Sequence, residues 1–296
     1  MNTADIRPAH RLFVCTDLDR TLLPNGVEPE APRARERFSR LTARPEVTLA
    51  YVTGRHRELV EEALDTFALP LPDYVIGNVG TSIYSVRRDG DWRMLTAWQE
   101  AIAPDWNGVT RKELERLLRG IGELELQPDE KQNRFKLSYY VPIAADRLGL
   151  DTAISERLLR RGVRARIVHS TDELAGVGLL DILPQRASKL HAIEYLMDTL
   201  GFDIGETVFS GDSGNDLEVL VSPIPAVLVA NAVDEVREAA TTAAAEKGIS
   251  ERLYLARGGF LDMNGNYAAG ILEGIAHFHP HVAAWIEEND ATDTKA

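Results

Sequence analysis

Three short apolar runs in the first third of the chain alternate with helix-forming segments, and this alternation constrains the fold more than any other sequence feature. The runs are Leu12–Thr16, Val47–Val52 and residues 74–76, and charged segments with helical spacing separate them. Continuous apolar runs of this length are typical of strands buried on both faces. Because strand–helix–strand units place their strands parallel, the pattern predicts a parallel sheet with helices on both sides.

The same alternation returns in the last third of the chain. We expect helices over residues 188–200 and 233–245, strands over 207–210 and 226–229, and a last helix over 267–278. The middle of the chain, residues 85–185, mixes strands and helices in another order. We therefore interpret it as an inserted α+β domain. Its expected elements are helices over 109–119 and 146–161 and strands over 135–141, 165–169 and 179–183.

Charge and composition exclude several classes of partner. The 33 basic and 46 acidic residues among 296 give a net charge of −13. Such a chain is poorly suited to binding nucleic acid through its phosphates or to docking on an anionic membrane. If it binds an anionic substrate, a metal ion or a local group of cations must overcome the overall field.

Targeting and redox features point to the cytoplasm. A single cysteine, Cys15, excludes an intramolecular disulfide and fits a reducing compartment. No apolar run reaches the roughly 18–20 residues of a membrane-spanning helix. Residues 1–10 lack the layout of a signal peptide. We predict a cytoplasmic protein.

Acidic residues follow the expected strands at the points where the strands end. Asp17 and Asp19 follow the first strand, and Asp212 and Asp216 follow the strand over 207–210. In an open parallel sheet the carboxyl ends of the strands line one crevice, so these four carboxylates should meet there. Crowded carboxylates repel unless a cation joins them, and all-oxygen ligation is typical of Mg²⁺. The alternative is that each aspartate only caps a helix or shapes a turn.

These residue types support phosphoryl transfer. A carboxylate such as Asp17 can attack phosphorus, and Asp19 could protonate the leaving oxygen and later deprotonate water. Thr53 and Gly54 end a strand before a helix, where a hydroxyl and free N–H groups can bind phosphate. Lys189 lies in the first turn of an expected helix, where a bound anion would favour its charge.

In chain order, these motifs resemble those of the haloacid dehalogenase superfamily of Mg²⁺-dependent phosphatases. The matching motifs are Asp17-x-Asp19-x-Thr21, Thr53-Gly54, Lys189 and Gly211-Asp212-x-x-Asn215-Asp216. The resemblance implies a Rossmann-like parallel sheet formed by residues 1–84 and 186–296, with residues 85–185 as an α+β cap of type C2B, which controls substrate specificity.

Within that superfamily the chain is similar to the sucrose-6-phosphate phosphatase family. The similar stretches are residues 79–81, 132–139, 181–186 and 270–278. The resemblance implies Asp17 as nucleophile and Asp19 as acid/base. It also implies that the Asp17 carboxylate, the Asp19 carbonyl and the Asp212 carboxylate hold Mg²⁺, with support from Asn215 and Asp216.

The cap carries the residues expected to bind the sugar. Lys136 and Ser138 match positions that contact the sugar in the similar family, and Gln132 and Asn133 belong to the same polar stretch. The alternative is that this stretch is only an exposed sheet face. The chain departs from the family pattern at Arg20, Ser82 and Leu190, where a small or amide residue, Glu and Gly are usual. Ser82 and Leu190 lie near the expected crevice, so they leave the exact sugar open.

The predicted substrate is a small-molecule sugar phosphate, with sucrose-6-phosphate as the first choice. Mannosylfructose phosphate and amino-sugar phosphates are alternatives within the same chemistry. A phosphosugar mutase is a rival reaction, and a non-catalytic sugar-phosphate sensor or a signalling receiver module is a rival of another class. Association with a sugar-phosphate synthase and a monomeric or small homo-oligomeric state complete the expectations.

Overall fold

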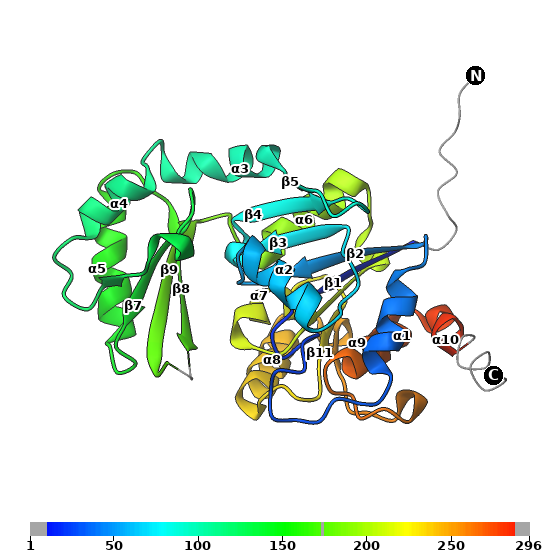
Figure 1. Ribbon diagram of the computed structural model, residues 1–296. Helices are drawn as coiled ribbons and strands as arrows, with labels where there is room; N and C mark the ends of the chain where they lie inside the picture. The colour runs from blue at the N-terminus through cyan, green and yellow to red at the C-terminus, as the bar shows by residue number, and fades with distance from the viewer. Residues whose placement is uncertain (1–10, 173–174, 288–296) are drawn as a thin grey trace, which may run out of the picture.

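The computed structural model describes residues 11–172 and 175–287, and these form two parts joined by two chain crossings (Figure 1). The larger part contains an eight-stranded sheet between layers of helices, and the smaller part is a four-stranded sheet with helices on one face. None of the helices in the described part combines the length and apolar character that a bilayer crossing requires. Residues 1–10, on which the cytoplasmic prediction partly rests, lie outside the described residues.

The large sheet has a switch in strand order beside β1. Its order is β12-β11-β10-β1-β2-β3-β4-β5, with β1 paired in parallel to β10 on one side and to β2 on the other. Such a switch point leaves a crevice at the carboxyl ends of the two central strands. The strands are β1 (Leu12–Thr16), β2 (Val47–Val52), β3 (Tyr74–Gly77), β4 (Ser82–Val86), β5 (Trp92–Met94), β10 (Thr207–Gly211), β11 (Ala226–Leu228) and β12 (Leu253–Leu255).

Side chains of β1 alternate between two hydrophobic layers, which explains its continuous apolar sequence. Leu12 and Val14 are buried with one helix layer, and Phe13 and Cys15 are buried with the other. The first layer is α1 (Ala34–Thr42), α2 (Arg57–Thr66), α9 (Ala268–Phe278) and α10 (Pro280–Glu287). The second is α6 (Lys189–Leu200), α7 (Leu217–Leu220) and α8 (Asp234–Glu246). The fold class is therefore the predicted α/β class with a Rossmann-like, mainly parallel sheet.

The smaller part, here called the cap, is an antiparallel sheet in the order β6-β7-β9-β8. The helices α4 and α5 pack on one face, where Tyr139 and Leu180 are buried. The other face turns toward the large sheet, and Arg166 of β8 reaches Glu218 of α7. The cap elements are α4 (Arg111–Leu118), β6 (Glu125–Leu126), β7 (Leu137–Val141), α5 (Arg147–Leu159), β8 (Ala165–Asp172) and β9 (Val177–Pro184), and α3 (Thr96–Ile102) leads into them.

The two crossings between the parts are tied together at Asp105. This carboxylate is fully buried in the first crossing and accepts a hydrogen bond from the backbone N–H of Arg186, 2.8 Å away in the second. The guanidinium groups of Arg164 and Arg186 pair with it. In the first crossing, Trp98 Nε1 donates a 3.0 Å hydrogen bond to the carbonyl of Gly80. These contacts fix where the cap leaves the sheet.

The structure differs from the sequence prediction at the edges of the elements. The predicted start of the insertion at residue 85 falls inside β4, and the large sheet continues through β5. The helix over 267–278 is not the last one, because α10 begins at Pro280, and proline at a helix start costs no hydrogen bond. The strands β4, β5, β6 and β12 and the helix α3 were not predicted. The short 3₁₀ helices are η1 (Asn78–Gly80), η2 (Ala103–Trp106), η3 (Asp129–Lys131), η4 (Ile204–Glu206), η5 (Gly214–Asp216), η6 (Ser250–Arg252) and η7 (Phe260–Asp262).

We expect Gly274→Ala to lower the free energy of unfolding by about 1–3 kcal/mol, because its Cβ would overpack the core. That atom would lie 2.1 Å from Cγ2 of Val227, a buried residue of β11. In an ordinary helix interior the same change stabilises by roughly 1 kcal/mol, so the sign of the effect tests the contact. Gly205→Ala is the control, since its Cβ meets nothing within 4 Å. Urea unfolding measures both, and a stabilised Gly274→Ala protein would contradict the expectation.

Candidate active site

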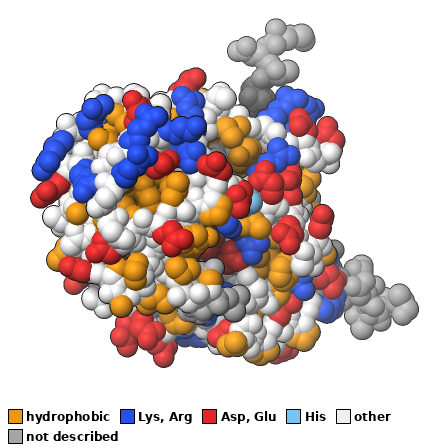
Figure 2. All heavy atoms as spheres, turned by 60° about the vertical axis from the view of Figure 1, so that its left-hand side comes forward, with side chains coloured by type: hydrophobic (Ala, Val, Ile, Leu, Met, Phe, Trp, Pro, Cys, Tyr) orange, Lys and Arg blue, Asp and Glu red, His pale blue; other side chains and the backbone are white. Residues whose placement is uncertain are grey.

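The predicted convergence of strand ends is present in the structure. Asp17 follows β1 and Asp212 follows β10, and the N–H of Asp17 donates a 2.9 Å hydrogen bond to the carbonyl of Ser210. Asp17, Asp212 and Asp216 each place one carboxylate oxygen within 4.8 Å of the others. All three side chains are buried. The space-filling view shows acidic side chains at the bottom of a hollow near the middle of this face (Figure 2).

Asp216 is held by groups of its own loop. Its Oδ2 accepts hydrogen bonds from the N–H groups of Asp212 and Ser213, at 3.1 and 3.2 Å. Gly211 permits this close approach, because a Cβ there would lie 2.6 Å from Cγ of Asp216. Both oxygens of Asp216 thus have protein partners, since Oδ1 pairs with Lys189 at 2.6 Å. The arrangement suits a carboxylate that supports the loop around Asp212.

Lys189 is the cation at the centre of this acidic group. The ammonium Nζ lies 3.2 Å from Oδ1 of Asp17, 2.6 Å from Oδ1 of Asp216 and 2.9 Å from Oδ1 of Asn215. Its side chain is 3 % exposed. Burial alone would lower the pKa of Lys189, but the charges of Asp17 and Asp216 raise it above its usual value. The ammonium therefore stays charged.

The sequence positions Lys189 through the start of α6. Ser188 caps the helix as predicted, accepting a 3.2 Å hydrogen bond from the N–H of His191. Gly80 packs against this start, and a Cβ on it would lie 2.5 Å from the carbonyl carbon of Ser188. The φ of Gly80 is 91°, a conformation that glycine adopts without strain. The loop after β3 thereby fixes the turn that carries the lysine.

The pKa values of Asp17 and Asp212 are raised in this acidic group. Burial, followed by the charges of Asp216 and Asp212, raises the pKa of Asp17, although Lys189 opposes the shift. Burial, followed by the charge of Asp216, raises the pKa of Asp212 to about 7, although the Thr21 hydrogen bond and the charge of Arg20 oppose it. Close, buried like charges are the physical cause in both cases. A bound divalent cation would remove the conflict.

Asp19 lies at the edge of the hollow in a different environment. Its carboxylate accepts two hydrogen bonds from Arg55, Nε to Oδ2 at 2.8 Å and Nη2 to Oδ1 at 2.6 Å. Asn25 Nδ2 donates a third to Oδ1 at 2.8 Å. Burial would raise the pKa of Asp19, but the hydrogen bonds and charge of Arg55 lower it overall. Asp17 and Asp19 thus have pKa values shifted in opposite directions, and without a bound metal Asp19 is the more readily ionised of the two.

The roles of Arg55 and Asn25 were not predicted, although both lie near the motifs. Arg55 directly follows the Thr53-Gly54 pair, and this position was the only available signal. Thr53 is buried and its Oγ1 accepts a 3.2 Å hydrogen bond from the N–H of Arg55, while Gly54 is exposed. Thr21 Oγ1 donates a 3.0 Å hydrogen bond to Oδ1 of Asp212. The threonine of the first motif therefore orients a carboxylate of the last.

The four cap residues predicted to bind sugar have different environments. The Gln132 amide is bonded to the backbone of Gln127 and Ser138. Ser138 is fully buried and donates its hydroxyl to Asp181. Asn133 Nδ2 donates a 2.9 Å hydrogen bond to Thr81 Oγ1 of the large part.

Lys136 is the fourth of these cap residues. Its Nζ forms an ion pair with Asp181 at 3.8 Å. Among the four, Lys136 is therefore the residue whose polar group is held by the longest contact within the protein.

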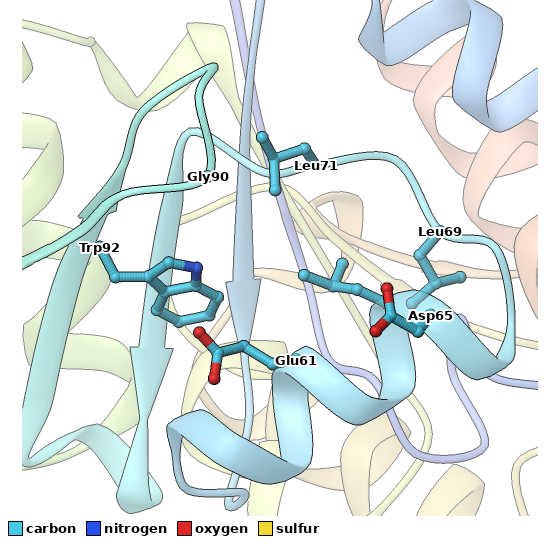
Figure 3. A pocket seen from close by; sticks show the side chains of 7 residues that line it. Glu61, Asp65, Leu69, Leu71, Gly90 and Trp92 are labelled. Carbon is cyan, nitrogen blue, oxygen red and sulfur yellow. The ribbon is translucent and has the colours of Figure 1, made fainter.

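A second hollow lies away from these residues, between α2 and β5 (Figure 3). Trp92 and Glu61 face one another across it, and Arg57 stacks on Trp92 and pairs with Glu61 at 2.8 Å. None of the predicted catalytic residues lines it. The carboxylates that line it do not belong to the buried acidic group, so the acidic hollow at the strand ends is the candidate active site.

The sheet, the cap and this set of carboxylates, threonine and lysine define the class of the protein. It is a phosphatase of the haloacid dehalogenase superfamily, a phosphoric monoester hydrolase. A family model described as sucrose-6F-phosphate phosphohydrolase matches residues 10–279, and the chain belongs to that family. The predicted superfamily is therefore confirmed.

Individual relatives agree with this family. A haloacid dehalogenase-like hydrolase of Nitrosococcus oceani is 50% identical over 94% of this chain and 74% of its own. Mannosylfructose-phosphate phosphatase of Agrobacterium fabrum is 31% identical over 75% of this chain and 84% of its own. Sucrose-phosphatase 1 of Nicotiana tabacum is 33% identical over 92% of this chain, which spans 60% of the tobacco protein.

Solved structures show the same fold. The sucrose-phosphatase of a Synechocystis species, solved with sucrose and phosphate, aligns with a TM-score of 0.69 and 27% identity, covering 91% of this chain and 98% of the other. A haloacid dehalogenase-like hydrolase of Bacillus subtilis aligns with a TM-score of 0.60 at 18% identity, and the alignment covers 90% of this chain and 92% of the other. The family and these folds support a phosphatase acting on a sugar phosphate.

The raised pKa of Asp212 predicts a pH dependence of stability in the metal-free protein. Because the folded pKa is about 7 and the ordinary value is 3.8, the folded state binds this proton more tightly than the unfolded state. Stability from this group is then complete below about pH 4 and is lost as the pH rises to about 7. We expect the free energy of unfolding of wild type, minus that of Asp212→Asn, to fall over this range by up to about 4 kcal/mol.

Urea unfolding in EDTA across this pH range measures the difference. Comparison with Asp212→Asn cancels the titration of carboxylates that do not interact with Asp212. A difference that stays flat or rises with pH would contradict the assigned shift.

Proposed function

We propose that this chain is a Mg²⁺-dependent phosphatase for a disaccharide phosphate, with sucrose-6-phosphate as its preferred substrate. The observation that carries the proposal is the placement of Asp17. It lies at the switch point, buried beside the Lys189 ammonium, with Asp19 two residues away in a more exposed position. A nucleophile needs a nearby cation and a second group that can exchange protons, and this arrangement supplies both.

The first half-reaction forms an aspartyl-phosphate. A carboxylate oxygen of Asp17 attacks the phosphorus of the substrate in line, and the bond between phosphorus and the sugar oxygen breaks. The carboxylic acid form of Asp19 gives its proton to that sugar oxygen, so the sugar leaves as a neutral alcohol. Arg55 stabilises the ionised form of Asp19, so the acid step requires Arg55 to shift away from this carboxylate when the substrate binds.

The second half-reaction releases phosphate. The Asp19 carboxylate takes a proton from water, and the water oxygen attacks phosphorus. The acyl-phosphate bond breaks, Asp17 is regenerated as a carboxylate, and inorganic phosphate leaves. Arg55 can then pair with Asp19 again after its proton is lost.

The donor atoms around Asp17 fit Mg²⁺. Carboxylate oxygens are hard ligands, and the buried oxygens of Asp17 and Asp212 lie close enough to share one ion. We assign the Asp17 carboxylate, the Asp19 carbonyl and the Asp212 carboxylate as ligands, with Asn215 and Asp216 holding the surrounding loop. When bound, Mg²⁺ would neutralise charge on the transferring phosphoryl group.

Phosphate binding falls to Thr53, Gly54 and Lys189. Thr53 directly follows β2, and Gly54 exposes its backbone where a Cβ would meet only Val79, at 3.9 Å. The Lys189 ammonium already faces Asp17 at 3.2 Å, so it can contact a phosphoryl group transferred to that carboxylate. Fixed donors of this kind stabilise charge on the equatorial oxygens.

Sugar recognition is assigned to the cap face that turns toward the hollow. Lys136 is the primary candidate, because its weak ion pair with Asp181 leaves its ammonium able to bind a hydroxyl. Asn133 lies at the contact with Thr81, at the boundary of cap and hollow. Ser138 and Gln132 orient these groups through Asp181 and the β7 backbone.

Other sugar phosphates remain alternatives. The similarity to mannosylfructose-phosphate phosphatase supports mannosylfructose phosphate as the second candidate, ahead of an amino-sugar phosphate. A relative named glucosylglycerol-phosphate synthase, from Pseudomonas anguilliseptica, is 28% identical over 220 residues, or 26% of its length. This supports association with a sugar-phosphate synthase, and we propose a cytoplasmic location for such a complex.

We expect Asp17→Asn to reduce turnover by at least roughly 10³-fold, because the amide cannot attack phosphorus. Asp19→Asn should reduce it by roughly 10²–10⁴-fold through loss of proton transfer. Asp198→Asn is the matched control, since Asp198 is an exposed carboxylate of α6. Phosphate release measures turnover, and thermal unfolding checks each fold. Wild-type turnover by folded Asp17→Asn protein would exclude the nucleophile assignment.

A phosphate-release screen tests the substrate. We expect the highest kcat/KM with sucrose-6-phosphate, a lower value with mannosylfructose phosphate and the lowest with glucose-6-phosphate. EDTA should abolish release, and added Mg²⁺ should restore it. An isomeric sugar phosphate in place of free phosphate would indicate a mutase, and binding without turnover would indicate a sensor.

A further inference from the structure

Arg20 occupies an unusual backbone position inside the first motif. Its φ is 57°, in the left-handed region that arginine rarely adopts. Its N–H donates to Oδ1 of Asn25 at 2.8 Å, and its carbonyl accepts from Nδ2 of Asn231 at 2.6 Å. These bonds hold the conformation, which costs roughly 1–2 kcal/mol for a residue with a Cβ. Backbone geometry alone would favour glycine or asparagine here, so the arginine side chain requires another explanation.

The side chain of Arg20 is directed at Asp212. Its Nε lies 3.7 Å from Oδ2 of Asp212, whose side chain is 5 % exposed. This Nε is also buried, and the described residues give it no hydrogen-bond partner. The Arg20 side chain is 34 % exposed, and the pair with Asp212 is the one ion pair that the described residues give it.

Among the described residues, no other charged group of the site forms an ion pair with Asp212. Lys189 contacts Asp17 and Asp216, and no ion pair between Lys189 and Asp212 occurs among the described residues. Thr21 donates to Oδ1 of Asp212, on the other side of the carboxylate. Arg20 is therefore the cation nearest to Oδ2, the oxygen that has no hydrogen-bond donor in the described part of the chain.

We propose that Arg20 is a resident counter-ion of Asp212 that competes with the divalent cation and so weakens metal binding. The inference rests on the metal site of the proposed function. A guanidinium and a divalent cation attracted to one carboxylate repel each other, and the low exposure of Asp212 limits solvent screening of that repulsion. Removing the charge of Arg20 should therefore tighten metal binding.

Isothermal titration of Mg²⁺ into the full, substrate-free chain tests this. We expect Arg20→Met to lower the Kd for Mg²⁺ by about tenfold or more, since it removes the charge and keeps a long side chain. Arg20→Lys keeps the charge and should stay within about threefold of wild type. Arg20→Asn relieves the backbone strain, so it keeps the test available if Arg20→Met does not fold.

Arg93→Met is the matched control, because it removes the same charge from an exposed site on β5. It should leave the Kd within about twofold, since solvent screens distant surface charges. An unchanged or higher Kd in Arg20→Met would overturn the inference, and so would equal tightening in Arg20→Lys. Absence of Mg²⁺ binding in wild type and every variant would instead contradict the metal assignment of the proposed function.

Discussion

The crowding of buried carboxylates around one ammonium is the interaction on which the rest of the site depends. The strand order places the ends of β1 and β10 side by side, so Asp17 and Asp212, which follow these strands, lie close together. Buried charges are tolerated only when they are paired, and Lys189 satisfies Asp17 and Asp216 together. Lys189 and the partly exposed Arg20 do not fully offset the repulsion among three buried carboxylates, and the pKa values of Asp17 and Asp212 are raised as a result. The fold thus holds an excess of buried negative charge at the strand ends, and a bound cation would reduce the resulting repulsion.

The catalytic groups and the cap are held in place by different kinds of contact. The catalytic groups follow strands buried between two helix layers, so their positions are set by packing. The cap reaches this region through polar contacts such as Asn133 with Thr81 and Arg166 with Glu218. Partly exposed contacts of this kind contribute only about 0.2–1 kcal/mol each. The crossings themselves are buried in one apolar cluster that includes Trp98, Trp106 and Ala187, and Asp105 keeps them together.

The sequence predicted the parts of the structure in which local pattern and tertiary environment agree. Buried parallel strands need continuous apolar runs, so β1, β2 and β10 were found with nearly correct bounds. The aspartates after β1 and β10 pointed to the candidate site. The strands β5 and β12 carry no such signal, because each has three residues and lies at an edge of the sheet. The strand β4 lacks it because two of its five residues are serines and its burial is mixed. The hydrogen bonds of Arg55 and Asn25 to Asp19 were missed for another reason. They depend on the path of loops, which periodicity does not encode.

The same distinction bears on sugar specificity. Residue types suited to hydroxyl groups are also suited to bonds within the cap, and the sequence cannot separate these uses. Gln132 and Ser138 have the expected chemistry, but the first ties β7 to the preceding loop and the second is buried against Asp181. A polar group already satisfied by the protein gains little from exchanging that partner for a sugar hydroxyl. Recognition should therefore rest on groups whose internal hydrogen bonds and ion pairs are weak. Lys136, a buried residue whose ammonium lies 3.8 Å from its carboxylate partner, fits this requirement better than Ser138 does.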